Sequence, residues 1–160
     1  WDPDVSADGA TVFASDRNGT NQLWVRRSDG RLLRLTDMNA SYIFAPRWSA
    51  DGKQILFLAV VEGKTDVFSL RPDGTGLERM TDGPEVDWFP HPSPDGAHVV
   101  WLAYPPGTKG HPGGLPVRLM VMPQDGGEGR ELVQLHGGQG TINVPSWSPD
   151  GRRFAFVRYR

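Results

Sequence analysis

Three histidines and one glutamine carry the most obvious coordination chemistry in this chain of 160 residues. They are His91, His111, His136 and Gln139, and all four lie in segments that depart from an otherwise regular pattern. Three imidazoles and a side-chain amide could together hold a divalent metal ion. Their spacing follows no local ligand motif. A metal site is therefore the alternative interpretation, and a surface that binds without any cofactor is the first.

The same irregular segments carry further polar and aromatic side chains that could contact a partner. Binding residues are commonly found on loops that a rigid scaffold holds in place. The sequence has no cysteine and no Gly-x-Ser-x-Gly motif, which excludes thiolate catalysis and a hydrolase nucleophile of that type. We therefore expect a non-catalytic surface that binds a protein or peptide. Its candidate residues are Asp87, Trp88, His91, His111, Gln139, Thr141 and Asn143.

A repeated tetrapeptide shows which elements must position these residues. Ser-x-Asp-Gly occurs four times, with serines 43, 44 and 55 residues apart. A proline stands three residues before each serine. A period in the forties with turn residues at fixed offsets predicts a stacked-repeat architecture. The serines are Ser6, Ser49, Ser93 and Ser148, and the prolines are Pro3, Pro46, Pro90 and Pro145.

Each repeat reads as four short strands. An apolar run rich in β-branched and aromatic residues follows each tetrapeptide, and in the first three repeats a second run, an Asp-Gly turn and a final strand come after it. Four-stranded meanders repeated about every forty residues predict an all-β fold, a β-propeller of antiparallel blades. We expect one partial propeller domain over residues 1–160. Its blades are approximately 1–37, 38–82, 83–137 and 138–160, the last incomplete.

Three complete blades and half of a fourth do not close a ring, because propellers have about 4–8 blades. A half-blade would also leave a bare sheet edge. We expect the chain to be a fragment of a longer propeller, with assembly around another copy as the alternative. In either case the remaining blades or another copy must complete the ring.

The irregular segments are expected at one end of the blades. In an up-and-down meander, the connections between blades share an end with the loop between the second and third strands. The Asp-Gly turns occupy the opposite end. The irregular segments 82–92, 104–116 and 136–144 therefore should converge at the mouth of the central channel. This convergence is the main sequence argument for a binding surface.

Several aromatic residues have a structural interpretation instead. Trp48, Trp147 and Phe89 lie near one repeat position and are expected to pack between blades. Trp24 and Trp101 lie within apolar runs and are expected in the core.

The charge pattern limits the classes of partner. The chain has 17 basic and 19 acidic residues without a basic stripe, so we expect no nucleic-acid binding. The longest apolar run, 55–61, is far too short to span a bilayer, so we expect no membrane insertion. The absence of cysteine does not distinguish cytoplasm from periplasm.

The repeat resembles that of a known family. Pro-x-Trp-Ser-Pro-Asp-Gly followed by an apolar strand, at 145–157 and more loosely at 46–58, resembles the TolB-type (WD-like) β-propeller repeat. Residues 87–160 also resemble a bacterial TolB-like group called biopolymer transporter Tol proteins, through Trp88-Phe89-Pro90-His91 and the glycine-rich stretch 137–145. The resemblance implies a bacterial, periplasmic protein that binds partner proteins at the cell envelope.

Two other families use similar repeats. Prolyl-oligopeptidase-type peptidases place such a propeller in front of an α/β-hydrolase domain. Oligogalacturonate lyases are similar propellers with a His/Gln metal site. These resemblances imply two alternatives: the propeller domain of a peptidase, and a metal-dependent polysaccharide lyase or hydrolase that uses His91, His111, His136 and Gln139 at the channel mouth.

Overall fold

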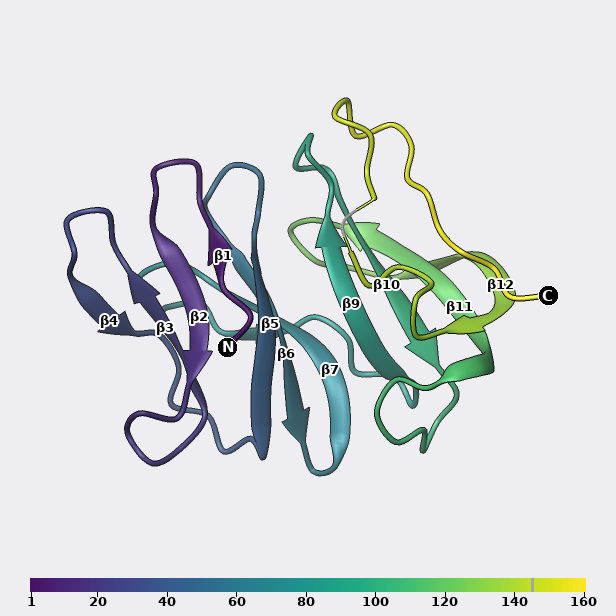
Figure 1. Ribbon diagram of the computed structural model, residues 1–160, viewed down its shortest axis with the longest axis horizontal. Coiled ribbons are helices and arrows are strands. Elements are labelled where there is room, and N and C mark those ends of the chain that lie inside the picture. Colours follow the sequence, from purple (N-terminus) through teal and green to yellow (C-terminus); the bar gives the residue numbers. More distant parts are fainter. Residues whose placement is uncertain (145) are drawn as a thin grey trace. The chain divides into compact units, whose positions relative to one another are not determined.

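The computed structural model describes residues 1–144 and 146–160, and all of its named elements are strands. Pro145, the proline expected before the fourth tetrapeptide, lies outside the described residues. The twelve strands form three four-stranded antiparallel sheets, each a meander in chain order (Figure 1). The all-β prediction and the three complete blades are thus confirmed. Within the described part of the chain, no helix could cross a membrane.

Each sheet contains one sequence repeat. The first sheet consists of β1 (Asp4–Val5), β2 (Thr11–Ser15), β3 (Gln22–Arg26) and β4 (Leu32–Arg34). The second consists of β5 (Tyr42–Trp48), β6 (Ile55–Val61), β7 (Lys64–Leu70) and β8 (Glu78–Arg79). The third consists of β9 (Val86–Pro92), β10 (His98–Tyr104), β11 (Gly113–Pro123) and β12 (Arg130–Gly138).

The chain divides into two compact units, Trp1–Met80 and Thr81–Arg160. The first unit contains two sheets, and β5 packs against β2 to bury one apolar cluster. Burial of such side chains is the main favourable contribution to the free energy of folding. The cluster includes Val12, Leu23, Val25, Ile43, Ile55 and Phe57. The second unit contains the third sheet and the last repeat.

The Ser-x-Asp-Gly tetrapeptide forms the same hydrogen-bonded turn in every repeat. The serine hydroxyl donates to the aspartate Oδ1, for example at 2.8 Å from Ser49 to Asp51. The glycine N–H donates to the serine carbonyl at 2.9–3.0 Å, and the aspartate accepts the backbone N–H two residues on. The glycines have φ between 67° and 83°, which other residues rarely adopt. The other Ser–Asp pairs are Ser6–Asp8, Ser93–Asp95 and Ser148–Asp150.

In β5 and β9, the proline before the tetrapeptide lies in a bulge of the strand. In β5, Ala45 and Pro46 together oppose one residue of β6, because the register shifts between Phe44 and Arg47. In β9, the register against β10 shifts at Phe89 and Pro90 in the same way. A proline is tolerated there because the strand lies at a sheet edge and the bulge interrupts the ladder.

The residue before Pro3, Pro46 and Pro90 adopts a left-handed backbone. The φ values are 48° for Asp2, 51° for Ala45 and 58° for Phe89. Left-handed φ is uncommon for residues other than glycine and costs about 1–2 kcal/mol. The same strain at one position in three repeats shows that it belongs to the blade design.

Tryptophans tie one repeat to the previous one. The Trp48 indole donates to the Asp4 carbonyl at 3.3 Å, and its backbone N–H donates to the Asp4 carboxylate at 2.8 Å. The Trp147 indole donates to the His91 carbonyl at 3.2 Å. Asp4 and His91 both stand two residues before a tetrapeptide serine, so the two links are equivalent. The predicted packing of Trp48 and Trp147 between repeats is confirmed.

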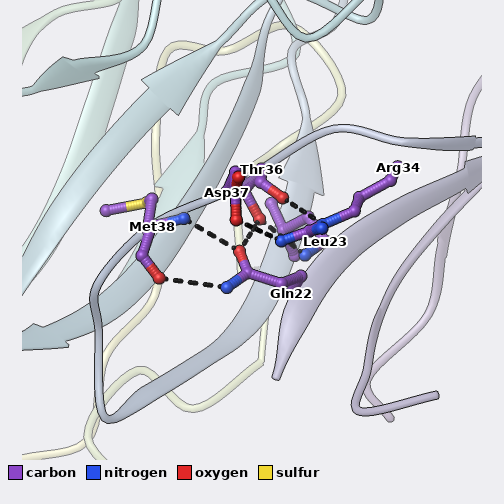
Figure 2. A network of polar contacts seen from close by, with 6 residues as sticks. All are labelled: Gln22, Leu23, Arg34, Thr36, Asp37 and Met38. Atoms are coloured by element: carbon purple, nitrogen blue, oxygen red, sulfur yellow. Dashed lines mark hydrogen bonds and ion pairs between the residues drawn. The ribbon is translucent and has the colours of Figure 1, made fainter. Parts of the chain in front are cut away.

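A polar network fixes the connection that leaves the first sheet (Figure 2). The buried Gln22 amide accepts from the Thr36 hydroxyl at 2.6 Å and from the Met38 N–H at 3.1 Å, and it donates to the Met38 carbonyl at 3.0 Å. Thr36 also accepts the Leu23 N–H at 2.9 Å. The network satisfies buried polar groups where the chain passes from β4 to β5.

The last repeat pairs only in part. Trp147 and Phe154 form an isolated antiparallel bridge, the contact expected between the first two strands of the half-blade. Beyond it, the Val157 N–H donates to the Thr141 carbonyl and the Tyr159 N–H donates to the His136 carbonyl. Residues 138–143 form hydrogen-bonded turns rather than an extended strand, so the pairing stays irregular in the described residues.

Acid should destabilise the repeat turns. Hydrogen bonds lower the pKa of the turn aspartates below the ordinary 3.8. The largest cause is the hydroxyl of the tetrapeptide serine for Asp8, Asp95 and Asp150, and the Lys53 backbone N–H for Asp51. A lowered folded-state pKa gives stability that is present above about pH 3.8 and is lost as the pH falls below it. We expect the midpoint temperature of thermal unfolding, measured by circular dichroism, to decrease as the pH is lowered below about 4. This decrease with pH should be less steep in the Asp95→Asn variant. The control Glu128→Gln removes an exposed carboxylate that lies outside the Ser-x-Asp-Gly turns.

Ala45→Gly should relieve the strain of the bulge. Glycine adopts a φ of 51° without steric cost, although it loses more backbone entropy on folding. We expect the free energy of unfolding in urea to rise by up to about 1 kcal/mol. The control Ala59→Gly, at a buried position of β6, should lower it by about 1 kcal/mol. Equal losses in the two variants would contradict a strained bulge.

Candidate functional site

The structure moves the boundaries of the three irregular segments. Most of 82–92, expected to be a connection, is strand β9. Only 105–112 separates β10 from β11, and β12 continues to Gly138. The prediction failed because prolines and glycines were treated as loop residues. Here they lie in bulged strands, with register shifts at Pro90 and near Gly114.

Within the second unit, the two remaining connections lie at one end of the sheet. The Gln139 N–H donates to the Pro112 carbonyl at 3.2 Å, which joins connection 105–112 to the segment after β12. At the opposite end, the Gln124 N–H donates to the Ala97 carbonyl at 3.0 Å, which joins the two Asp-Gly turns. The irregular segments and the regular turns therefore occupy opposite ends of this sheet.

Four side chains meet at the irregular end: Trp88, Phe89, His111 and Gln139, called the His111 cluster below. The His111 ring lies edge-on to Trp88, with centroids 4.3 Å apart, and to Phe89, with centroids 5.1 Å apart. Its Nδ1 forms a hydrogen bond with Gln139 Oε1. Trp88 is buried, Phe89 and His111 are half-buried, and Gln139 is exposed. The cluster thus has an aromatic base and a polar outer edge.

Thr141 and Asn143 shape the segment that carries Gln139. The Thr141 Oγ1 accepts the Gly138 N–H at 2.9 Å, and the Asn143 Oδ1 accepts the Gly140 N–H at 2.7 Å. A Cβ at Gly138 would lie 2.1 Å from the Pro112 carbonyl oxygen, so only glycine permits this approach. Thr141 is buried and Asn143 is half-buried. Both residues act on the shape of the turn in this structure.

Asp87 and His91 point into the protein. Each is only 3% exposed. Asp87 Oδ1 accepts the Trp101 indole N–H at 2.9 Å, and His91 Nε2 contacts the Ile142 carbonyl. These contacts give both side chains a structural role in joining β9 to its neighbours.

The four predicted metal ligands do not come together. Among the described residues, no group of three or more His, Cys, Asp or Glu side chains is placed to hold a metal ion. Of the predicted set, only His111 and Gln139 are joined by a hydrogen bond, and His91 is engaged with Ile142. The residues present therefore do not fit a metal centre.

Two residues at this end were not among the predicted site residues. Phe89 was expected between blades, but its ring lies against His111 and Trp88. Its position before a repeat proline was the available signal, because that position is the strained bulge. Tyr104, the last residue of β10, is fully buried, and its hydroxyl has no hydrogen-bond partner among the described residues. Burial, with a smaller effect of Tyr159, raises the pKa of Tyr104.

A separate cavity of about 360 Å³ lies in the first unit, at the Asp-Gly turns. Its lining includes Asp8, Asp51, Arg27 and Trp48. These polar groups already have partners: the carboxylates cap their own turns, and Arg27 donates to the Pro72 carbonyl at 3.3 Å. Each of these charged groups therefore has at least one partner within the protein.

No protein-family model matches the chain. An uncharacterized protein of Agrobacterium fabrum is 47% identical over 114 residues, which cover 71% of this chain and 39% of that protein. Dipeptidyl-peptidase 5 of Porphyromonas endodontalis is 36% identical over 89 residues, or 55% of this chain and 13% of that protein. The Tol-Pal system protein TolB of Syntrophus aciditrophicus is 40% identical over 52 residues, which cover 32% of this chain and 12% of that protein. The chain thus spans about two fifths or less of the length of these relatives.

Solved structures show the same architecture. A TolB candidate from Agrobacterium tumefaciens superposes with a TM-score of 0.85 and 40% identity, over 98% of this chain and 57% of that chain. TolB from Acinetobacter baumannii superposes with a TM-score of 0.70 and 19% identity, over 94% of this chain and 35% of that chain. An oligogalacturonate lyase in complex with manganese superposes with a TM-score of 0.64 and 13% identity, over 93% of this chain and 49% of that chain. The last two matches show the fold alone.

Asp87→Ala should test whether Asp87 is structural. The substitution leaves the buried Trp101 indole N–H without its acceptor, which costs about 1–3 kcal/mol. We expect that loss in urea unfolding, and a smaller loss when Trp101→Phe is already present. The double-mutant cycle should give a coupling energy of at least about 0.5 kcal/mol. Additive losses would contradict the structural role.

Proposed function

We propose that this chain, a relative of the TolB-like β-propeller proteins, is a non-catalytic scaffold that binds a protein or peptide through the His111 cluster. One observation carries the proposal. Strand β9, connection 105–112 and the segment after β12 bring aromatic, imidazole and amide groups to one end of a sheet. Aromatic side chains with polar neighbours are typical of residues that dominate binding energy.

The composition of the cluster suits a protein partner. Trp88 and Phe89 supply a rigid apolar base, and His111 and Gln139 supply polar atoms at its edge. No ion pair involves a member of the cluster in the part of the chain that the structure describes. Aromatic rings and amide groups favour a protein partner over nucleic acid or lipid, which are bound mainly through charge.

The location and the completion of the ring are part of the same proposal. The resemblance to TolB supports a place in the bacterial periplasm. The chain matches only 57% and 35% of the two TolB-type structures, which supports completion of the ring by further blades or another copy. The molar mass of the purified chain in solution, measured by light scattering, tests the second arrangement: a stable monomer argues against another copy.

A second candidate function is the propeller domain of a peptidase. It is favoured by the 36% identity to dipeptidyl-peptidase 5 of Porphyromonas endodontalis. The product of the complete gene should then cleave dipeptidyl amide substrates, and a full-length product without such activity would remove this candidate. The polysaccharide lyase alternative has less support, because the predicted metal ligands do not converge among the described residues.

Alanine substitutions at His111 and Gln139 test the binding surface. Each substitution should lower the affinity for a partner captured and purified from the envelope fraction by about tenfold, since loss of one central contact costs about 1–2 kcal/mol. His98→Ala is the matched control, because His98 is exposed and lies at the opposite end of the same sheet. Affinity is measured by biolayer interferometry after circular dichroism has shown intact folding. Unchanged affinity in both cluster variants would contradict the proposal.

A further inference from the structure

We infer that the end of β12 and the turn after it form a binding site for a tyrosine in an extended segment of a partner protein. In this structure the chain's own Tyr159 occupies that site. The site lies beside the His111 cluster but uses backbone atoms and glycines instead of the side chains of that cluster. The inference therefore goes beyond the proposed function and does not depend on binding by the His111 cluster.

Tyr159 anchors a segment that is otherwise exposed. Within residues 155–160 only Tyr159 is half-buried, and the other five residues are exposed. Phe156 and Val157 are apolar, yet they remain 42% and 54% exposed. The segment lies beside β12 (yellow in Figure 1). A general apolar contact would bury Phe156 or Val157 first, so the placement of Tyr159 indicates a site with its own shape and hydrogen bonds.

Two glycines make room for the tyrosine ring. A Cβ at Gly113 would lie 3.1 Å from the Tyr159 Cε2 and 3.2 Å from its hydroxyl oxygen, and a Cβ at Gly140 would lie 3.4 Å from that oxygen. The hydroxyl donates to the Gln139 carbonyl. The site thus combines a surface without side chains for the ring with a backbone acceptor for the hydroxyl. A phenylalanine fits the same surface but leaves that carbonyl without its donor.

The backbone of the bound segment is recognised as well. β12 is the last strand in the order of the third sheet, so one of its edges has no neighbouring strand among the described residues. The Tyr159 N–H donates to the His136 carbonyl of β12 at 2.9 Å, and the Val157 N–H donates to the Thr141 carbonyl at 3.0 Å. Donors two residues apart are typical of an extended segment added to a sheet edge. Such backbone bonds accept many sequences, which leaves selectivity to the tyrosine.

The repeat offers Tyr159 a different place. Tyr104 and Tyr159 each lie eleven residues after a tetrapeptide serine. Tyr104 pairs with Val86 in the first strand of its own blade, whereas Tyr159 bonds to β12 of the preceding blade. In a complete fourth blade, which the proposed ring requires, Tyr159 can take the position equivalent to Tyr104. The site is then open to a tyrosine of a partner.

Substitution of Tyr159 should open the site to a peptide. The probes are acetyl-Val-Arg-Tyr-amide, which copies residues 157–159, and the same peptide with phenylalanine in place of tyrosine. In calorimetric titration, Tyr159→Ala should bind the tyrosine peptide at least about tenfold more tightly than wild type, because the chain's own ring no longer competes. Tyr159→Phe, which keeps the ring and loses the hydroxyl, should be intermediate. The phenylalanine peptide should bind Tyr159→Ala about fivefold more weakly than the tyrosine peptide, the effect of one hydrogen bond.

A matched pair of glycine substitutions tests the shape of the site. Gly113 and Gly83 both have ordinary backbone angles, so alanine adds no backbone strain at either. In the Tyr159→Ala background, Gly113→Ala should weaken the tyrosine peptide at least about tenfold. Gly83→Ala meets only the flexible Glu85 carboxylate and should leave the peptide affinity within about twofold. Tyr42→Ala, at an exposed tyrosine of the first unit, should bind the peptide as wild type does.

NMR of labelled tyrosines follows the competition in the unaltered chain, which contains only Tyr42, Tyr104 and Tyr159. Millimolar tyrosine peptide should shift the Tyr159 ring resonances toward those of a solvent-exposed tyrosine and leave those of Tyr42 unchanged. Unchanged Tyr159 resonances would contradict displacement. Tyr159 resonances that change with protein concentration alone would assign the site to a second copy and overturn a peptide partner.

Three calorimetric results would also overturn the inference: no binding of the tyrosine peptide to Tyr159→Ala or Tyr159→Phe, equal affinity for the tyrosine and phenylalanine peptides, or full affinity after Gly113→Ala. Failure of the proposed function is distinguishable from these results. It is measured with the captured partner and the His111→Ala and Gln139→Ala variants, none of which enters the peptide titrations.

Discussion

The bulge at the repeat proline of β5 and β9 is the constraint on which the proposed binding end depends. It holds Ala45 and Phe89 in left-handed backbone and sets two residues of the first strand against one of the second. In the third sheet this geometry turns Phe89 toward His111, and it leaves Asp87 and His91 engaged within the protein. Without the bulge, the side chains of β9 would alternate strictly between the two faces of the sheet. The residues on the two sides of the bulge would then face different neighbours.

The two ends of the third sheet differ in how their polar groups are satisfied. The tetrapeptide turns satisfy their own polar groups, with the Asp95 carboxylate accepting from Ser93 and Ala97. At the other end, the Nε2 atoms of His111 and Gln139 have no hydrogen-bond partner among the described residues. Unused hydrogen-bonding capacity on a rigid base is what a binding surface requires, and a self-satisfied turn cannot supply it.

The sequence predicted the repeat architecture because turn chemistry is local. Ser49 and Asp51 lie two residues apart and interact whatever the rest of the chain does. The contact of His111 with Gln139 spans 28 residues and was anticipated only as a shared end of the sheet. Asp87, His91, Thr141 and Asn143 were grouped with binding residues, because their hydrogen bonds within the protein cannot be read from composition. Phe89 was assigned to packing, since its left-handed backbone has no signature other than the following proline.

The tryptophan link has a consequence for how such repeats diverge. Trp48 and Trp147 bind the main-chain carbonyls of Asp4 and His91, an acidic residue in one repeat and an imidazole in the other. Every residue has a carbonyl, so the indole hydrogen bond places no demand on the side chain of its acceptor, and the Asp4 carboxylate adds a separate bond to the Trp48 backbone N–H. Neighbouring repeats can therefore accumulate substitutions, or be duplicated, while the tryptophan hydrogen bond between them is preserved.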